Sequence, residues 1–322
     1  MSGWVVCRAS PSLALLKYWG KLADGTNLPA TPSLAVTLGG LHTDTSARLS
    51  DADSVMIDGE PADPARMAPF LDCLRSRIGA SVRFEARSTN SFPTAAGLAS
   101  SSSGFAALAG ACVRAAGKEL SPEDLSELAR VGSVSAARSV FGGFVLLPAG
   151  ALFARQAFGP GHWPQLRIVV AVTHRGRKAV SSRDAMRETS STSPFYRQWV
   201  SESQALLPLA LQGLADRDLE KLGEAVRASY SMMHAMMLAA RPQLLYWLPA
   251  TLAVMQACGE LRRQGIGAWE TIDAGPQVKI LCLDEDAQRV IAHVKECAPG
   301  IDTFLCFPGE GLALTSAKEP VP

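Results

Sequence analysis

The sequence has 322 residues, of which 48% are apolar and 19% are charged. A chain of this length exceeds what one ordinary hydrophobic core supports, so two domains with a cleft between them are expected. The near balance of 31 basic and 30 acidic residues excludes the broad basic surface that nucleic-acid binding requires, and no nucleic-acid partner is predicted.

The first half of the chain is rich in short apolar or alternating runs, which predict strands. These runs cover residues 4–8, 33–38, 43–49, 54–57, 81–87 and 143–147. Helical patterns interrupt them at about 64–78 and 100–116. A third helix is predicted after Ser121, which is followed by Pro122 and the carboxylates of Glu123 and Asp124, a favourable helix start.

The second half changes to long helical patterns after a strand predicted at 166–172. Helices are expected over 195–214, 219–238 and 242–264, then strands over 267–273 and 278–283 joined by a turn at 274–276, and a helix over 286–297. The change marks a second domain, and the boundary is placed so that the domains cover residues 1–180 and 181–322. The prediction is an α+β fold with a mostly antiparallel sheet in each domain.

The cysteines and histidines bear on compartment and metal content. The seven cysteines are scattered without a Cys-x-x-Cys pair, which indicates reduced core residues and a cytoplasmic protein. The cysteines and the five histidines show no zinc-binding spacing. No run has the length and apolarity of a signal sequence or a membrane span, so no membrane association is expected.

A Gly/Ser-rich segment, residues 93–104, follows a predicted strand and leads into an amphipathic helix. Small residues let a backbone approach an anion, while free N–H groups at a helix start and serine hydroxyls can bind phosphate oxygens or a magnesium ion. A flexible linker is the alternative, and the flanking strand and helix disfavour it. No Gly-Lys-Ser/Thr follows the glycine and no Gly-x-Gly-x-x-Gly occurs, which excludes a Walker loop and a dinucleotide fingerprint.

Three further segments combine charged and hydroxylic residues: Lys-Tyr-Trp-Gly-Lys at 17–21, Gly-Ser-Val-Ser-Ala-Ala-Arg-Ser at 132–139 and Asp-Ala-Gly-Pro at 273–276. Each has an ordinary structural alternative. The lysines can be surface residues, Ser133 can cap a helix beside a solvated Arg138, and Asp273 can form a turn. The functional interpretation of Arg138 is that its planar fork binds a carboxylate or phosphate.

Together the four segments, in their order and spacing, resemble the mevalonate diphosphate decarboxylases of the GHMP kinase superfamily. The resemblance extends over about residues 9–283 and includes residues 180–183, 192–193 and 233–235. It implies a ribosomal protein S5 domain 2-like N-terminal domain, a ferredoxin-like C-terminal domain and a homodimer. The implied reaction, part of the mevalonate pathway of isoprenoid biosynthesis, converts (R)-mevalonate 5-diphosphate and ATP into isopentenyl diphosphate, ADP, phosphate and CO2, through 3-phosphorylation with Mg²⁺.

The resemblance also implies roles for individual residues. Asp273 would orient and deprotonate the 3-hydroxyl, Lys17 and Arg138 would complete a catalytic triad, and Arg138 would hold the substrate carboxylate. The implied substrate-binding residues are Tyr18, Lys21, Ser133, Ser135, Arg138 and Ser193. The implied ATP-binding residues are Pro93, Ala96, Gly97, Leu98, Ala99, Ser100 and Ser101, and the last two are the implied Mg²⁺ ligands.

Some positions depart from the family pattern. Ser12 stands where asparagine is usual, and Thr31-Pro32 stands where an Asn-Ser or Asn-Asn pair is usual; Val134 replaces a glycine, and Gln277 a common asparagine. Ser12 and Thr31 are expected on strands that enter the substrate side. They leave open a phosphomevalonate decarboxylase or a mevalonate 3-kinase, and a non-catalytic nucleotide-binding homologue is a second alternative. His234 is expected to be structural.

Overall fold

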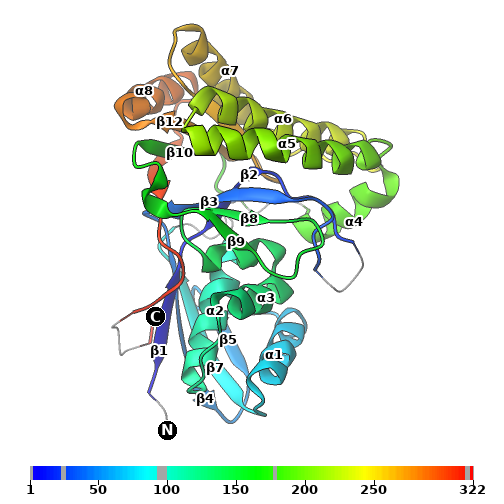
Figure 1. Cartoon of the computed structure of the whole chain (residues 1–322), viewed down its shortest axis with the longest axis vertical. Coiled ribbons are helices and arrows are strands. Elements are labelled where there is room, and N and C mark those ends of the chain that lie inside the picture. The colour runs from blue at the N-terminus through cyan, green and yellow to red at the C-terminus, as the bar shows by residue number, and fades with distance from the viewer. Residues whose placement is uncertain (1–2, 23–26, 93–99, 177–179, 316–319, 322) are drawn as a thin grey trace.

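The computed structural model describes residues 3–22, 27–92, 100–176, 180–315 and 320–321. These residues form an α+β structure with two sheets, each covered by its own helices (Figure 1). The predicted residues Pro93, Ala96, Gly97, Leu98 and Ala99 lie outside the described ranges.

The first sheet has the strand order β14-β1-β4-β7-β5-β6. Its pairings are antiparallel except for β5 with β7. The bounds are β1 Val5–Ala9, β4 Thr43–Ser50, β5 Ser54–Ile57, β6 Glu60–Pro61, β7 Arg83–Asn90 and β14 Ala313–Leu314.

Three helices pack on this sheet, and their starts follow from local sequence. The carboxylate of Asp63 accepts a hydrogen bond from the backbone N–H of Ala65 ahead of α1, and Ser121 caps α3 through the backbone N–H of Asp124. Their shared core includes Phe70, which packs edge-on against Phe105. The bounds are α1 Pro64–Ile78, α2 Ser100–Ala115 and α3 Pro122–Gly132.

The second sheet has the order β11-β12-β10-β13-β3-β8-β9, and β2 pairs with β3. It therefore combines strands from both ends of the chain, and the domain boundary at residue 180 stays a prediction. The bounds are β2 Ser12–Leu16, β3 Ser33–Gly39, β8 Phe144–Leu147, β9 Arg155–Phe158, β10 Leu166–Val172, β11 Trp269–Ile272, β12 Val278–Leu283 and β13 Asp302–Pro308.

Five helices accompany the second sheet, and α5 and α6 lie side by side as a long pair (Figure 1). No helix within the described ranges is both long and apolar enough to cross a membrane. The helices are α4 Ser182–Thr192, α5 Tyr196–Asp216, α6 Leu219–Leu238, α7 Pro249–Arg263 and α8 Ala287–Cys297; the 3-10 helices are η1 Val134–Val140, η2 Pro160–His162 and η3 Asp284–Asp286.

The predicted elements are confirmed to within a few residues, with one clear error. The helix predicted over 242–264 begins only at Pro249, because Leu248 before that proline has an extended backbone. The sequence interpretation missed β6, β9, β13, β14 and α4, whereas Ser12 was expected on a strand and begins β2.

Candidate active site

A carboxylate held by two buried lysines lies at the mouth of the β11–β12 hairpin. Lys17 directly follows β2 and places its Nζ 2.6 Å from Oδ1 of Asp273, while Nζ of Lys279, on β12, lies 2.9 Å from Oδ2. Each lysine side chain is 2% exposed, whereas that of Asp273 is 31% exposed. Each carboxylate oxygen therefore has its own ammonium partner, and one part of Asp273 remains accessible to a ligand.

The charges in this cluster control its protonation. The surrounding protein disfavours a charged carboxylate, but the ammonium groups of Lys17 and Lys279 outweigh that effect and hold the pKa of Asp273 well below its usual range. Burial lowers the pKa of Lys17 to about 8, although the charge of Asp273 opposes this shift. Asp273 is thus ionised at neutral pH, and Lys17 loses its proton at a pH slightly above neutral.

This pKa predicts a pH dependence. Lys17 pairs with Asp273 through its charged form, which is lost as the pH rises through about 8. We expect kcat/KM, which reports on the free enzyme, to fall by about tenfold per pH unit above that value. Lys17→Arg keeps its charge at high pH, so its pH profile should lose this fall even if its turnover is lower. An identical fall in both proteins would assign the titration to another group.

Arg138 is buried in η1 with its guanidinium in a cradle of two serines. Its Nε donates to Oγ of Ser12 at 3.2 Å, and its Nη1 donates to Oγ of Ser33 at 2.6 Å. Burial lowers its pKa to about 10, and the charge of Asp273 opposes part of this shift. The alternative of a solvated arginine is therefore wrong, because η1 turns Arg138 into the interior, where it is 2% exposed.

Two residues of α6 lie beside the cluster. The hydroxyl of Ser229 accepts a hydrogen bond from the backbone N–H of Lys17 at 2.8 Å. The ring of His234 packs against those of Tyr230 and Trp247, and burial lowers its pKa to about 4, so it is neutral. The expectation that His234 is structural stays a prediction.

The predicted serines of two distant segments meet between α2 and α3. Oγ of Ser133 lies 3.4 Å from Oγ of Ser101 and 3.1 Å from Oγ of Ser135. The side chain of Ser133 makes no capping hydrogen bond at the start of η1, which contradicts the capping alternative. The hydroxyls therefore connect the start of α2, predicted to bind ATP, with the segment predicted to bind substrate.

A cavity of about 390 Å³ lies beside Ser100 and Ser101, within the size range of small-molecule sites. Its walls are apolar at residues such as Val55, Ile57 and Phe105 and polar at Asn90. A flat heterocycle with polar edges suits such a lining, and the α2 N-terminus suits a phosphate chain. This fits ATP.

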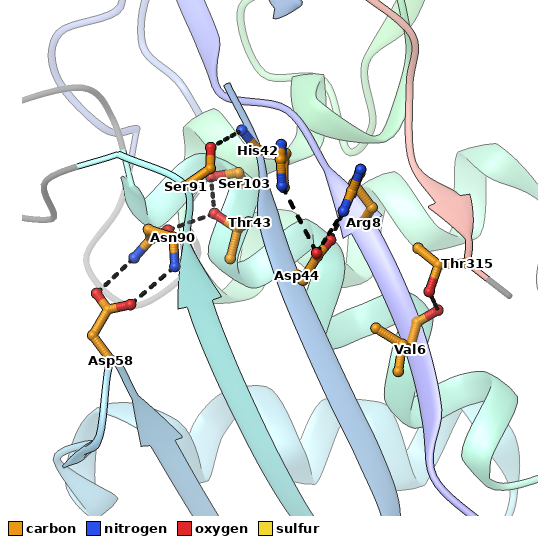
Figure 2. Close-up of polar contacts among 10 residues, drawn as sticks. All are labelled: Val6, Arg8, His42, Thr43, Asp44, Asp58, Asn90, Ser91, Ser103 and Thr315. Atoms are coloured by element: carbon orange, nitrogen blue, oxygen red, sulfur yellow. Dashed lines mark hydrogen bonds and ion pairs between the residues drawn. The ribbon is translucent and has the colours of Figure 1, made fainter. Parts of the chain in front are cut away.

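Hydrogen bonds order one wall of the cavity. Figure 2 shows Asn90 between two partners: its amide nitrogen and its backbone N–H both donate to the carboxylate of Asp58 at 2.9 Å, and its amide oxygen accepts from Thr43 at 2.6 Å. Thr43 also contacts Oγ of Ser103 on α2 at 2.6 Å. No local sequence pattern indicates this wall, because its residues come from separate elements.

The remaining predicted substrate-binding residues differ in their surroundings. The buried hydroxyl of Tyr18 has no hydrogen-bond partner among the described residues, so a ligand could pair with it. Nζ of Lys21 donates to Oδ1 of Asn27 at 2.5 Å. Ser193 donates to the carbonyl of Met236 at 2.8 Å, and no contact recorded within the described ranges joins it to the other predicted residues.

The departures from the family pattern have distinct structural roles. Thr31 precedes β3 instead of lying on a strand, and its hydroxyl accepts from the backbone N–H of Trp19 at 3.2 Å, so its predicted placement on a strand was wrong. Ser12 does begin β2 and contacts Arg138. Gln277 is buried and accepts from the backbone N–H of Thr173 at 2.6 Å, which fastens the hairpin to the end of β10.

Sequence reasoning missed Lys279, Ser33, Ser229 and Asn90. Lys279 lies six residues after Asp273, and a lysine paired with an aspartate across a hairpin could have been noticed from that spacing. The other three carry no local signal, because polar residues of this kind are common on any strand or helix.

Comparison with known proteins gives matches over nearly the whole chain. The family model for the diphosphomevalonate decarboxylase-like N-terminal domain matches residues 9–157, and the model for the mevalonate 5-diphosphate decarboxylase C-terminal domain matches residues 168–313. The diphosphomevalonate decarboxylase of Gibberella zeae is 34% identical over 94% of this chain and 88% of its own, and the human one is 32% identical over 94% and 83%.

Solved structures match the fold. The crystal structure of mevalonate diphosphate decarboxylase from Staphylococcus aureus aligns with a TM-score of 0.91 at 32% identity, covering 98% of this chain and 99% of that one. The structure of MDDEF in complex with MVAPP, AMPPCP and magnesium aligns with a TM-score of 0.90 at 34% identity over the same shares.

Proposed function

Because the chain belongs to the diphosphomevalonate decarboxylase family, we propose that it decarboxylates (R)-mevalonate 5-diphosphate to isopentenyl diphosphate at the expense of ATP. The observation that carries the proposal is the buried cluster in which Lys17 and Lys279 hold Asp273, with Arg138 interacting electrostatically with that aspartate. A nucleotide-binding relic has no need for such a cluster.

In the phosphoryl-transfer step, the 3-hydroxyl donates a hydrogen bond to the carboxylate of Asp273 while its oxygen attacks the γ-phosphorus of ATP. A carboxylate whose pKa is held low is a weak base, so its main contribution is orientation, and the proton leaves late in the step. The two ammonium groups supply positive charge beside an anionic substrate.

The nucleotide occupies the cavity beside α2, with its phosphates toward the helix N-terminus. The fit rests on the lining of that cavity and on the hydroxyls of Ser100 and Ser101, and one relative carries AMPPCP and magnesium. A Mg²⁺ ion held there would neutralise charge on the transferred phosphoryl group. Ser100 and Ser101 are the proposed protein ligands.

In the elimination step, the C3–O bond of the phosphorylated intermediate breaks and inorganic phosphate leaves. The electron pair of the C–C bond to the carboxylate forms the new double bond, and CO2 is released. Within the described ranges Arg138 donates only to Ser12 and Ser33, which leaves three of its five N–H donors for the substrate carboxylate. The two serines fix the guanidinium in place.

The diphosphate is proposed as the substrate because the proposed substrate-binding residues offer more hydrogen-bond donors than a monophosphate would use. Ser133 and Ser135 form one cluster, Lys21 lies near the end of α3 through Asn27 and Val131, and the hydroxyl of Tyr18 is unpaired among the described residues. A buried donor left unpaired costs about 1–3 kcal/mol. The altered Thr31 binds backbone, which leaves Ser12 as the change nearest the proposed carboxylate site.

We therefore expect kcat/KM for CO2 release to be about ten to a thousand times higher with mevalonate 5-diphosphate than with mevalonate 5-phosphate, each tenfold being about 1.4 kcal/mol. The measurement compares the diphosphate, the monophosphate and mevalonate at saturating ATP and magnesium. Equal or better use of the monophosphate would make the chain a phosphomevalonate decarboxylase. ADP formation from mevalonate without CO2 would make it a 3-kinase, and neither product from any substrate would identify a non-catalytic homologue.

The same proposal includes a cytoplasmic homodimer acting in isoprenoid biosynthesis through the mevalonate pathway, with domains over residues 1–180 and 181–322. The two family models, which match residues 9–157 and 168–313, support a division into two domains. Sedimentation equilibrium of the purified chain tests the dimer, and a single species of 34.1 kDa would contradict it.

A further inference from the structure

Three side chains with metal-binding atoms face one another between α7 and α8. Glu260 is on α7, and His293 and Cys297 are four residues apart on α8, so they share one face of that helix. One ligand atom from each lies within 4.8 Å of the other two. In Figure 1 the two helices lie at the end of the molecule opposite α1, and none of the three residues belongs to the proposed catalytic cluster.

The geometry centres on one imidazole nitrogen. Nε2 of His293 lies 2.9 Å from Oε2 of Glu260 and 3.7 Å from Sγ of Cys297. Around a tetrahedral zinc ion, bond lengths of about 2.0–2.3 Å place a nitrogen and a sulfur ligand about 3.6 Å apart, and a nitrogen and an oxygen ligand about 3.3 Å apart. The His293–Cys297 separation already matches, and the His293–Glu260 separation needs to widen by a few tenths of an ångström.

A second carboxylate lies on the other side of the ring. Oε2 of Glu296 is 3.7 Å from Nδ1 of His293. In the metal-free protein a proton lies between Nε2 and the Glu260 carboxylate. A metal ion replaces that proton, and a carboxylate near Nδ1 favours keeping the ring's other proton on Nδ1, as in the outer shell of many metal sites. An ordinary surface ion pair between histidine and glutamate requires neither the thiol nor this second acid.

We propose that Glu260, His293 and Cys297 bind one divalent transition-metal ion of the zinc class, with water as the fourth ligand. One nitrogen, one sulfur and one carboxylate oxygen form a ligand set that Zn²⁺ accepts and Mg²⁺ does not favour. Binding releases the thiol proton of Cys297 and couples α7 to α8. Glu260 is 42% exposed, which provides a path for the ion.

The cysteines and histidines alone show no zinc-binding spacing in the sequence, so this site was not predicted. The i, i+4 spacing of His293 and Cys297 places two ligands on one face of a helix, but two ligands are fewer than a zinc site needs. The third comes from Glu260, 33 residues earlier, and only the packing of α7 against α8 brings it into place.

The test is a Zn²⁺ titration of the full reduced chain, without nucleotide or Mg²⁺, against a chromogenic chelator. Wild type should bind one equivalent that Cys297→Ser, His293→Asn and Glu260→Gln each lose, and Glu296→Gln should weaken it by about tenfold. Cys73→Ser is the matched control, because Cys73 is the other partly buried cysteine and lies in α1; it should bind like wild type.

Cobalt supplies a direct signature of the ligand set. Co²⁺ bound at this site should give the visible bands of a tetrahedral ion and a near-ultraviolet sulfur-to-cobalt band, and Cys297→Ser should abolish the latter. Absence of a bound equivalent in wild type would overturn the proposal. So would an equivalent that survives in both Cys297→Ser and His293→Asn but disappears in Asp273→Asn, since the metal would then lie at the catalytic cluster.

Discussion

Asp273→Asn is expected to lower the rate of CO2 release by about 10³–10⁴-fold, a loss comparable to that seen on removing a charged member of a catalytic unit. The amide keeps the shape of the side chain but removes the negative charge between two ammonium groups whose side chains are each 2% exposed. It can neither receive the hydroxyl proton nor balance both lysines. ATP affinity should change little, because the residues that line the nucleotide cavity all lie between positions 43 and 108 and do not include Asp273.

The matched control is Asp284→Asn. Asp284 directly follows β12 of the same hairpin but pairs with Arg167 at 2.7 Å and is 59% exposed, so the substitution should leave turnover near the wild-type value. Single-turnover rates and equilibrium ATP binding are measured for both variants. If Asp273→Asn turned over at close to the wild-type rate, Asp273 would have no role in the chemistry.

The substitution should also change the protonation of Lys17. Without the aspartate, the charge that opposes the effect of burial on Lys17 is gone, so the pKa of Lys17 falls further and this lysine loses its proton nearer neutral pH. A lower melting temperature at pH 6 than at pH 9 in Asp273→Asn would report this directly, because charging the buried Lys17 then opposes folding.

The second large effect is expected for Arg138→Met. The guanidinium lies in a preformed cradle made by Ser12 and Ser33, and removal of one preorganised donor to a reacting anion costs about 10²–10³-fold in rate. We expect a loss of that size in kcat/KM for CO2 release, while the dissociation constant of ATP changes by less than about threefold. Arg138→Lys should recover only part of the rate, because it keeps the charge but loses the fork.

Arg48→Met is the control for removing an arginine elsewhere on the first sheet. Arg48 pairs with Glu85 on the surface, and such pairs contribute about 0–1 kcal/mol to stability, so its kinetics should match wild type. A large rise in the ATP dissociation constant of Arg138→Met with normal substrate affinity would move Arg138 to the nucleotide side.

The candidate catalytic residues that could be predicted from the sequence are those in short, recognisable segments. Lys17, Arg138 and Asp273 were each identified through their neighbours, and the structure gives Lys17 and Asp273 a direct ion pair. Lys279 was missed because a lysine in an apolar strand is usually interpreted as a residue of the solvent-facing side, whereas β12 is buried along nearly its whole length. Burial of both faces of β12 results from the packing of the whole sheet, and the six residues of the strand alone do not indicate it.

The missed elements have a similar explanation. α4 has few apolar residues, and its Thr189 receives a hydrogen bond from the indole of Trp19 at 2.7 Å, a contact across 170 residues. β13 alternates weakly and is held by pairing with β10 and β3. Local periodicity carries no information about such partners, whereas strongly amphipathic α3 and the alternating strands near residue 50 were predicted well.

The position of β13 has a consequence for how the protein is made. This strand pairs with β10 through residues such as Cys306 and with β3 through Phe307 and Pro308, yet it follows β2, β3, β8, β9, β10, β11 and β12 along the chain. On the ribosome, the edges of β3 and β10 therefore stay open until residues 302–308 emerge. Open edges invite pairing with other chains, so the nascent chain is exposed to mispairing at β3 and β10 until β13 has been made.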